Sequence, residues 1–251
     1  MHVEGSIAGM TATGRRRAGV DAPASIWDFP EHGSRGPKPR YNRAAIAALA
    51  VRIADAEGLE AVTMRRLAAE LGIAVMSLYN YVPARDHLVQ LMTDNLAAEY
   101  AYLGTPATEP RAAIAALARQ TRDIARRHPW LAGLLHRPMP LGPNGLRYLD
   151  YFLGLLAGSR LGTGAKLELI TMISSVATMY GAMQAAPAGQ LASAAERAQP
   201  LALAAARGRY PNLAAALASV GQPRGHADIF GSSIERLIDL TRLGLQRPGS
   251  A

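Results

Sequence analysis

The sequence predicts an all-α fold, in which a small N-terminal three-helix unit precedes a larger C-terminal helical domain. Apolar residues recur at spacings of three and four along most of the chain after residue 41. Glycines such as Gly58 and Gly72 interrupt this pattern where helices are expected to end. No segment shows the apolar–polar alternation of a half-buried strand. We therefore expect about nine or ten helices and no sheet.

The composition excludes several protein classes. The 251 residues are 49% hydrophobic, which is enough for a sizeable core, and include no cysteine, which rules out disulfides and thiolate metal sites. The N-terminal region lacks the apolar run of a secretory signal, and no stretch reaches the ~18 apolar residues of a spanning helix. We expect a cytoplasmic protein with no membrane partner.

The net charge of +8 is unevenly distributed along the chain. Residues 41–100 hold five basic and seven acidic side chains, whereas residues 101–251 hold sixteen and eight. The overall charge is therefore weak support for nucleic-acid binding, and the placement of single arginines matters more.

Residues 1–40 are rich in Gly, Pro, Arg and Ser and show no periodic pattern. We predict a flexible basic arm, in which only the short SIWDF segment is a candidate for packing. Such an arm either contacts DNA through its minor groove or phosphates, or remains a solvated tail.

A pair of short helices follows a first predicted helix at Arg43–Glu57. Thr63 is a good N-cap, and Gly72 suits the left-handed conformation that ends a helix. A second short helix is expected from Ala74 to about Tyr81, with Leu78 facing inward. This arrangement is typical of a helix-turn-helix, which places its second helix in the DNA major groove. The spacing alone also fits helix pairs that have no role in DNA binding.

The remaining predicted helices complete two domains. A helix from about Pro83 towards Tyr102 closes a head at residues 41–102. Residues 103–251 then form the larger domain, with helical patterns at about 110–128, 129–136, 143–160, 165–186 and 226–246. The segment Pro187–Gln222 holds one further helix, Leu191–Arg207, or is partly disordered.

The stretch RIADAEGLEAVTMRRLAAELGIAVMSLYNYV, followed by PARDHLVQLM, resembles the DNA-binding domain of TetR-family transcriptional repressors. The later stretches RRHPWLAGLLHRPMPLGPNGLRYLD and FGSSIERLIDL resemble, more loosely, the ligand-binding domain of the tetracycline-repressor branch. The resemblance implies a ligand-responsive repressor that binds a near-palindromic double-stranded operator as a homodimer and is released by a small molecule.

The resemblance also implies which side chains meet DNA. Tyr79 and Arg85 match positions that contact phosphate, and Arg65 matches one that reaches a guanine or a phosphate. Asn80 has the amide geometry for a bidentate contact to adenine. Tyr81 is open to a second interpretation, as a packing residue against the first helix. The predicted DNA-contacting set is Thr63, Met64, Arg65, Val75, Met76, Ser77, Tyr79, Asn80, Tyr81 and Arg85.

The C-terminal half is expected to dimerise and to bind the effector. Lys166–Ala186 is apolar on more than one face and Asp228–Leu245 is amphipathic, so both helices need partners. Aromatic and methionine side chains are typical cavity linings, although each of them also suits a plain core. The predicted pocket comprises Trp130, His136, Tyr148, Tyr151, Phe152, Met172, Met179, Tyr180 and Met183. No metal or other cofactor, and neither tetracycline nor Mg²⁺, is expected.

Enzyme motifs are not found. The chain has no G-x-S-x-G elbow and no H-E-x-x-H, and Gly158–Glu168 has the wrong spacing for a phosphate-binding loop. Two alternatives to the ligand-responsive repressor remain. One is an activator or constitutive DNA-binding regulator without a small-molecule ligand, and the other is a helical enzyme or scaffold that keeps the head only as a packing module.

Overall fold

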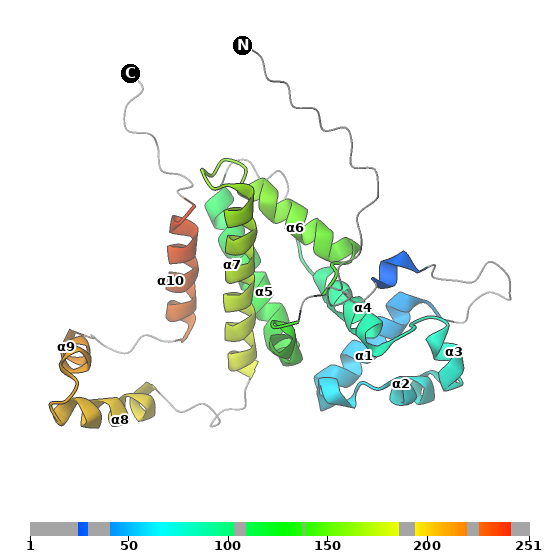
Figure 1. Ribbon diagram of the computed structural model, residues 1–251, viewed down its shortest axis with the longest axis horizontal. Helices are drawn as coiled ribbons and strands as arrows, with labels where there is room; N and C mark the ends of the chain where they lie inside the picture. The colour runs from blue at the N-terminus through cyan, green and yellow to red at the C-terminus, as the bar shows by residue number, and fades with distance from the viewer. Residues whose placement is uncertain are drawn as a thin grey trace, which may run out of the picture.

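The computed structural model describes residues 25–29, 41–102, 109–137, 139–185, 194–219 and 226–241. These residues form an all-helical molecule without a β-strand, as the sequence predicted. The helical head lies on one side of the molecule and the longer C-terminal helices lie beside it (Figure 1). Buried side chains form two clusters: the first fills the head and also takes in Ile124, Trp130 and Leu134 of the C-terminal part, and the second fills the rest of the C-terminal part.

The head consists of four α-helices: α1 (Arg43–Glu57), α2 (Met64–Leu71), α3 (Val75–Tyr79) and α4 (Arg85–Ala97). A 3₁₀ turn, η2 (Leu59–Ala61), joins α1 to α2. Helix α1 packs against α4, and its buried stripe includes Ile46 and Ala50, neither of which is exposed. The side chain of Asn42 accepts a hydrogen bond from the Ala45 backbone and caps the start of α1.

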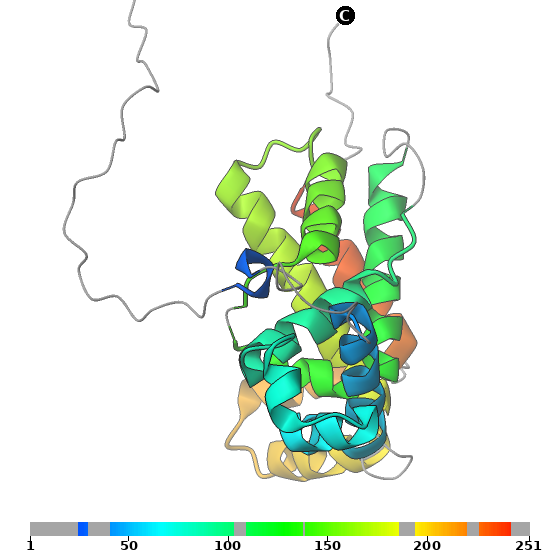
Figure 2. The ribbon, with the colours of Figure 1, turned by 90° about the vertical axis from the view of Figure 1, so that its right-hand side faces the viewer.

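The C-terminal part contains α5 (Pro110–Arg127), η3 (Pro129–Leu134), α6 (Pro143–Leu155), α7 (Thr163–Ala185), α8 (Ala194–Ala206), α9 (Pro211–Ser219) and α10 (His226–Asp239). Helices α5 and α7 pack along each other, and α10 contacts both (Figure 1). Gly181 permits the close α5–α7 approach, because a Cβ there would lie 2.2 Å from the Arg122 carbonyl oxygen. Turned by 90°, the head lies in front of these helices (Figure 2).

Several boundaries differ from the sequence prediction. Helix α4 ends at Ala97 rather than near Tyr102, and α6 ends at Leu155 because Ser159 closes a turn onto the Leu156 carbonyl. Residues 129–134 form a 3₁₀ helix. Helix α9 was not predicted, although Pro211 stands at its first position, where a missing N–H costs nothing. Residues 242–246, predicted as the end of the last helix, lie outside the described residues.

The SIWDF segment packs against the head, as the sequence allowed for this part of residues 1–40. It forms a 3₁₀ turn, η1 (Ile26–Asp28), and the side chain of Ile26 is fully buried in the head core. The Ile26 backbone N–H donates to the side chain of Gln90 on α4 at 2.9 Å. Burial of an isoleucine favours order over a solvated tail. The rest of the arm lies outside the described residues.

No helix within the described ranges is both long enough and sufficiently apolar to cross a membrane.

Candidate nucleic-acid interface and effector cavity

The turn between α2 and α3 is built from local sequence signals. Thr63 Oγ1 accepts a hydrogen bond from the Arg66 backbone at 3.1 Å, which caps α2. Gly72 ends the helix with φ of 64°, a left-handed conformation that is strained for residues with a Cβ. The Ile73 N–H then bonds to the Ala68 carbonyl and fixes the direction in which α3 leaves the corner.

Helix α3 presents a polar face to solvent. Leu78 is fully buried and anchors the helix, whereas Met76 is 74% exposed and Tyr79 is 39% exposed. Ser77 and Asn80 are exposed beside them. A short helix anchored by one leucine therefore offers methyl, hydroxyl and amide groups, which are the side-chain types that read base edges in a major groove.

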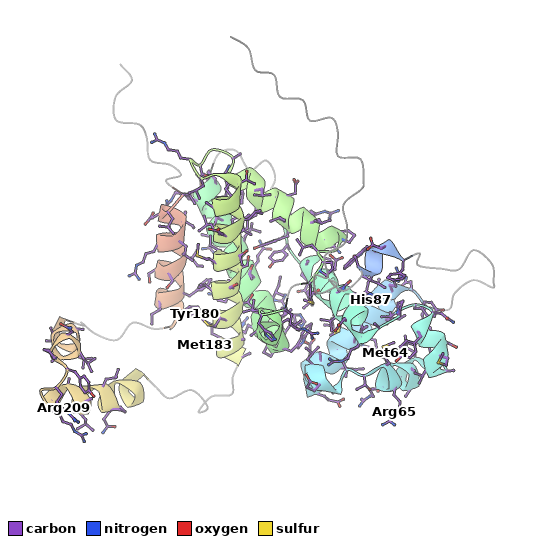
Figure 3. All side chains as sticks on the ribbon, viewed as in Figure 1. Met64, Arg65, His87, Tyr180, Met183 and Arg209 are labelled. Atoms are coloured by element: carbon purple, nitrogen blue, oxygen red, sulfur yellow. The ribbon has the colours of Figure 1, made fainter. Side chains whose placement is uncertain are left out.

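Arg65 lies on the adjacent exposed surface of α2 and projects away from the head (Figure 3). No hydrogen bond or ion pair to another described residue involves its guanidinium. Its neighbour Arg66 is instead held between Glu57 and Glu70, each at 3.0 Å. Of these two arginines, only Arg65 can therefore contact phosphate without first giving up an ion pair.

Three of the predicted DNA-contacting side chains turn towards the head core. Met64 is only 8% exposed, and Val75 and Tyr81 are partly buried against the same cluster. Met64 is the first residue of α2 and packs inward with Leu67, because positions three apart share one helix face. The partial burial of Tyr81 agrees with the packing role that the sequence left open, and Met64 likewise packs inward; DNA contacts by these side chains stay predictions.

Arg85 has a structural task in addition to its predicted one. Its guanidinium donates to the carbonyl oxygens of Leu59 and Val62, at 3.1 and 3.2 Å, and lies 3.8 Å from Glu60. These bonds tie the start of α4 to the turn that precedes α2. Arg85 therefore holds α2 and α4 together whether or not it also contacts a phosphate.

A partly buried polar junction joins the head to the C-terminal part. Asp55 on α1 accepts a hydrogen bond from the indole N–H of Trp130 at 2.8 Å, and its same oxygen lies 2.7 Å from His128 Nδ1. His128 Nε2 in turn lies 3.3 Å from a carboxylate oxygen of Glu99, just beyond α4. One carboxylate of the head is thus shared by two side chains that flank the α5–η3 corner.

A second junction connects α4 to α6. Asp94 Oδ1 accepts hydrogen bonds from the backbone N–H groups of Asn144 and Gly145, both at 2.9 Å. Gly142, which precedes α6, has no side chain with which to cap it, so that α4 supplies the acceptor. A Cβ at Gly142 would lie 2.2 Å from Trp27, which brings the N-terminal segment to the same corner.

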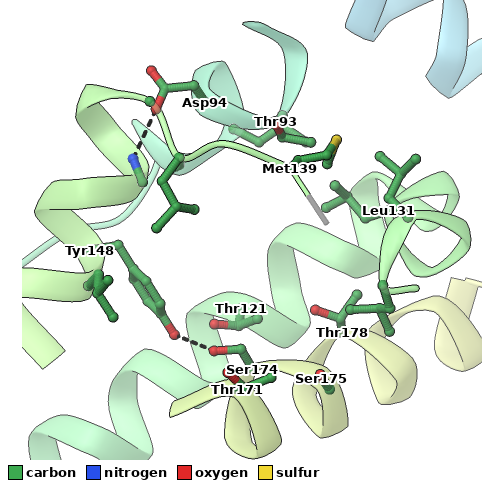
Figure 4. Close-up of a pocket in the computed structure, with 18 of the residues that line it drawn as sticks. Thr93, Asp94, Thr121, Leu131, Met139, Tyr148, Thr171, Ser174, Ser175 and Thr178 are labelled. Carbon is green, nitrogen blue, oxygen red and sulfur yellow. Dashed lines mark hydrogen bonds between the residues drawn. The ribbon is translucent and has the colours of Figure 1, made fainter. Parts of the chain in front are cut away.

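A cavity of about 490 Å³ opens between α4, α5, α6, α7 and η3. Its lining comprises Thr93, Asp94, Leu96, Ala97, Tyr100, Thr121, Ile124, Leu131, Leu134, Leu135, Arg137, Met139, Pro140, Leu141, Gly142, Gly145, Tyr148, Leu149, Leu167, Ile170, Thr171, Ser174, Ser175 and Thr178. Hydroxyl side chains of α7 lie along one side of it, and Leu131 and Met139 lie on the opposite side (Figure 4). This volume is in the range of small-molecule sites, which is ~300–1,000 Å³.

Two tyrosines form the aromatic wall of the cavity. The rings of Tyr100 and Tyr148 lie 4.5 Å apart between centroids, and their hydroxyls bond to Thr121 and Ser174, each at 2.9 Å. Burial raises the pKa of both phenols above the ordinary value for tyrosine. Both side chains therefore remain neutral hydrogen-bonding groups at physiological pH.

Two family models match the chain. Residues 46–92 match the bacterial regulatory proteins of the tetR family, and residues 105–240 match the tetracyclin repressor-like C-terminal domain. The HTH-type transcriptional repressor DrrR1 of Streptomyces coeruleorubidus is 36% identical over 243 residues, which cover 90% of this chain and 87% of the relative. The chain belongs to the TetR family of transcriptional repressors.

Solved structures agree with this family membership. ActR of Streptomyces coelicolor in complex with (S)-DNPA is 26% identical with a TM-score of 0.68, over 83% of this chain and 100% of that one. ActR in complex with actinorhodin is 25% identical with a TM-score of 0.64, over 82% and 99% of the two chains. The matched families and relatives of this TetR-family chain are transcriptional regulators and not enzymes.

Nine side chains of this TetR-family chain were predicted to line an effector pocket. One of them, Tyr148, belongs to the lining of the described cavity. The other eight are placed outside the lining, because most of them serve the two cores or the outer surface. Trp130 belongs to the head junction and Phe152 is fully buried in the C-terminal core. Tyr151 stacks on Tyr102 and Tyr180 stacks on Phe230. His136, Met172 and Met179 are exposed, and Met183 lies near the end of α7 (Figure 3).

The hydroxyl side chains of the cavity were not predicted from the sequence. Thr171, Ser174, Ser175 and Thr178 all line it from α7. Their spacing is i, i+3, i+4 and i+7, which puts them on one helix face. A stripe of hydroxyl side chains on one face of an otherwise apolar helix could therefore have indicated a cavity wall. The sequence prediction rested on aromatic and methionine side chains and did not include these residues.

Proposed function

We propose that this TetR-family protein is a ligand-responsive transcriptional repressor. It binds a near-palindromic operator as a homodimer through residues 41–102 and is released when a small molecule occupies the C-terminal cavity. The observation that carries the proposal is that one helix, α4, belongs to the head and also lines the cavity through Thr93 and Asp94.

DNA recognition is assigned to the exposed surface of α3 and the start of α2. In this proposal Tyr79, Ser77 and Thr63 bond phosphates or bases, and Asn80 and Met76 reach base edges; the exposure of all five side chains supports it. Arg65 supplies a positive charge next to them. The overall negative charge of the head does not oppose this, because phosphate contacts depend on single cations near the groove.

Homodimer formation is supported by exposed apolar side chains on α7 and α10. Met172 and Met179 on α7 are 42% and 49% exposed, and Ile229 on α10 is 37% exposed. A second copy would cover these side chains. A two-fold dimer spaces two recognition helices about one DNA turn apart, ~34 Å, and so requires a near-palindromic operator.

Effector release is supported by the connection between the cavity and α4. A ligand that prefers one arrangement of the cavity walls must also bias the position of α4, and thereby the spacing of the two α3 helices. To shift the equilibrium from 1:99 to 99:1, the ligand needs about 5.5 kcal/mol of preference for the DNA-free state. The relative ActR was crystallised with (S)-DNPA and with actinorhodin, which supports a ligand site in this chain as well.

The decisive test is binding of the full-length dimer to DNA from upstream of its own gene, at ~0.15 M salt with excess random competitor. The expected result is a protected near-palindrome. Tyr79→Ala should weaken binding to all sequences, whereas Asn80→Ala should relax the sequence preference by ~1–3 kcal/mol per base contact. Specific binding that no cavity ligand relieves would favour a constitutive regulator, and no specific binding in a random-sequence selection would contradict the proposal.

A further inference from the structure

The α7 side of the cavity carries an ordered row of hydroxyl groups. Thr171 is exposed at one end of the row and Thr178 is 8% exposed at the other, with Ser174 and Ser175 partly buried between them. The row therefore runs from the open part of the cavity into the molecule. Four hydroxyls on one helix face are unusual in a helix that otherwise buries Leu169, Ile170 and Ile173.

Two of these hydroxyls, called uncommitted below, have no hydrogen-bond partner among the described residues. Ser174 bonds to Tyr148, and Thr171 donates to the Leu167 carbonyl at 2.9 Å. Ser175 and Thr178, in contrast, make no side-chain hydrogen bond to any other residue that the structure describes. Both residues line the cavity, so their hydroxyls are available to a ligand that bonds to them, and one such bond contributes ~0.5–1.5 kcal/mol.

Both charged side chains of the cavity already have bonding partners. Asp94 receives the backbone N–H groups of Asn144 and Gly145, and Arg137 bonds to Asp86 at 2.9 Å. No other charged residue is part of the described lining. An ionised ligand would lose its hydration and meet no counter-ion that is free of other partners, which is unfavourable.

The remaining walls select for shape. Tyr100 and Tyr148 offer ring faces, while Leu131 and Met139 close the side opposite α7 (Figure 4). Aromatic rings stack on such faces in offset or tilted arrangements. The cavity is thus apolar and aromatic on most sides and hydroxyl-bearing on one.

Resting on the proposed function, we infer that the effector is an uncharged aromatic molecule with hydroxyl or carbonyl groups along one edge, and that Ser175 and Thr178 determine its specificity. The polar edge of the ligand lies against the row of α7 hydroxyls. Its ring lies between the two tyrosines and the wall formed by Leu131 and Met139. Removal of the uncommitted hydroxyls removes the preference for oxygenated ligands without closing the cavity.

The test compares naphthalene, 2-naphthol, 2,3-dihydroxynaphthalene and 2-naphthoate as probes, by equilibrium dialysis with the full-length protein. Each added hydroxyl is expected to tighten binding about 3- to 10-fold, which corresponds to one net hydrogen bond. The 2-naphthoate anion should bind more weakly than 2-naphthol. Tightest binding of the carboxylate, equal binding of all probes, or no binding of either hydroxylated probe at millimolar concentration would each overturn the inference.

Variants assign the preference to named side chains. The double change Ser175→Ala with Thr178→Val should reduce the preference for 2,3-dihydroxynaphthalene over naphthalene to less than about 3-fold, because both uncommitted hydroxyls are gone. Ser232→Ala on α10 is the matched control, since its hydroxyl bonds only to its own helix at the Ile229 carbonyl. An unchanged preference in the double variant would refute the assignment.

The same preparations also separate this inference from the proposed function. Operator binding is measured on each sample before the dialysis. If the unmodified protein binds its operator but shows no preference for the hydroxylated probes, the inference alone is contradicted. Hydroxyl preference in a protein that binds no DNA contradicts the repressor proposal and leaves the ligand chemistry intact.

Discussion

The carboxylate of Asp94, on the last helix of the head, accepts the backbone N–H of Asn144 at the start of α6 at 2.9 Å. The side chain of Asn144 returns a hydrogen bond to the other oxygen of the same carboxylate at 3.0 Å. Both Asp94 and Gly145, its other backbone partner, line the cavity. These charge-assisted hydrogen bonds connect the α6 N-terminus directly to α4.

This relationship predicts the effect of Asp94→Ala. The change removes the only side-chain acceptor that the described residues offer to the first N–H groups of α6. The free energy of unfolding should fall by about 1–2 kcal/mol, as for other lost helix caps. Urea titration measures this, and Asp150→Ala on the exposed side of α6 is the control. Equal stability of the two variants would show that the cap is not required.

Gly142 should not tolerate a side chain. A Cβ there would lie 2.2 Å from Trp27 and 2.4 Å from Asp94, so that either the N-terminal segment or α6 must move. Gly142→Ala should destabilise the protein by about 1–3 kcal/mol, as overpacking does elsewhere. The emission spectrum of Trp27 should change in the same variant, because its surroundings shift.

Gly154 is the matched control for that experiment. It lies in the same helix, and a Cβ there meets no atom within 4 Å. Gly154→Ala should leave stability unchanged or raise it by up to ~1 kcal/mol, because alanine favours a helix. If both alanine variants behave alike, the contact of Trp27 with the α6 corner does not constrain the fold.

The fold could largely be predicted from the sequence, because its signals are local. Thr63 and Gly72 act on their own helix, and both helix ends appear where these residues predict them. The cavity could not be predicted in the same way, since its lining depends on how distant helices pack. Trp130 and Phe152 suit a ligand site by residue type, yet one satisfies Asp55 and the other fills a core. Sequence alone does not distinguish an aromatic side chain that lines a cavity from one that fills it.

The two arginines predicted to contact DNA should behave differently. Arg65 has no partner among the described residues, so that Arg65→Ala should weaken operator binding and lower the salt slope by about one unit, with unchanged thermal stability. Arg85→Ala should lower the melting temperature, because the carbonyls of Leu59 and Val62 lose their donor. Fluorescence anisotropy and thermal unfolding on the same samples separate these outcomes. An unaltered melting temperature for Arg85→Ala would indicate that its contacts to the α1–α2 turn are dispensable.

The last prediction concerns Asp55, which joins α1 to the α5–η3 corner. Asp55→Ala leaves the indole N–H of Trp130 without its acceptor and removes the carboxylate that faces His128. Two polar groups in a largely buried junction then lack partners, and the free energy of unfolding should fall by about 1–3 kcal/mol. Glu57→Ala on the same helix is the control: its partner Arg66 keeps Glu70, so that little change is expected. Because the two core clusters meet at this corner, where Trp130 and Leu134 join the head cluster, urea unfolding of Asp55→Ala should also become less cooperative, with a lower m-value. A single steep transition identical to that of the Glu57 variant would show that the other contacts between the two parts hold them together without Asp55.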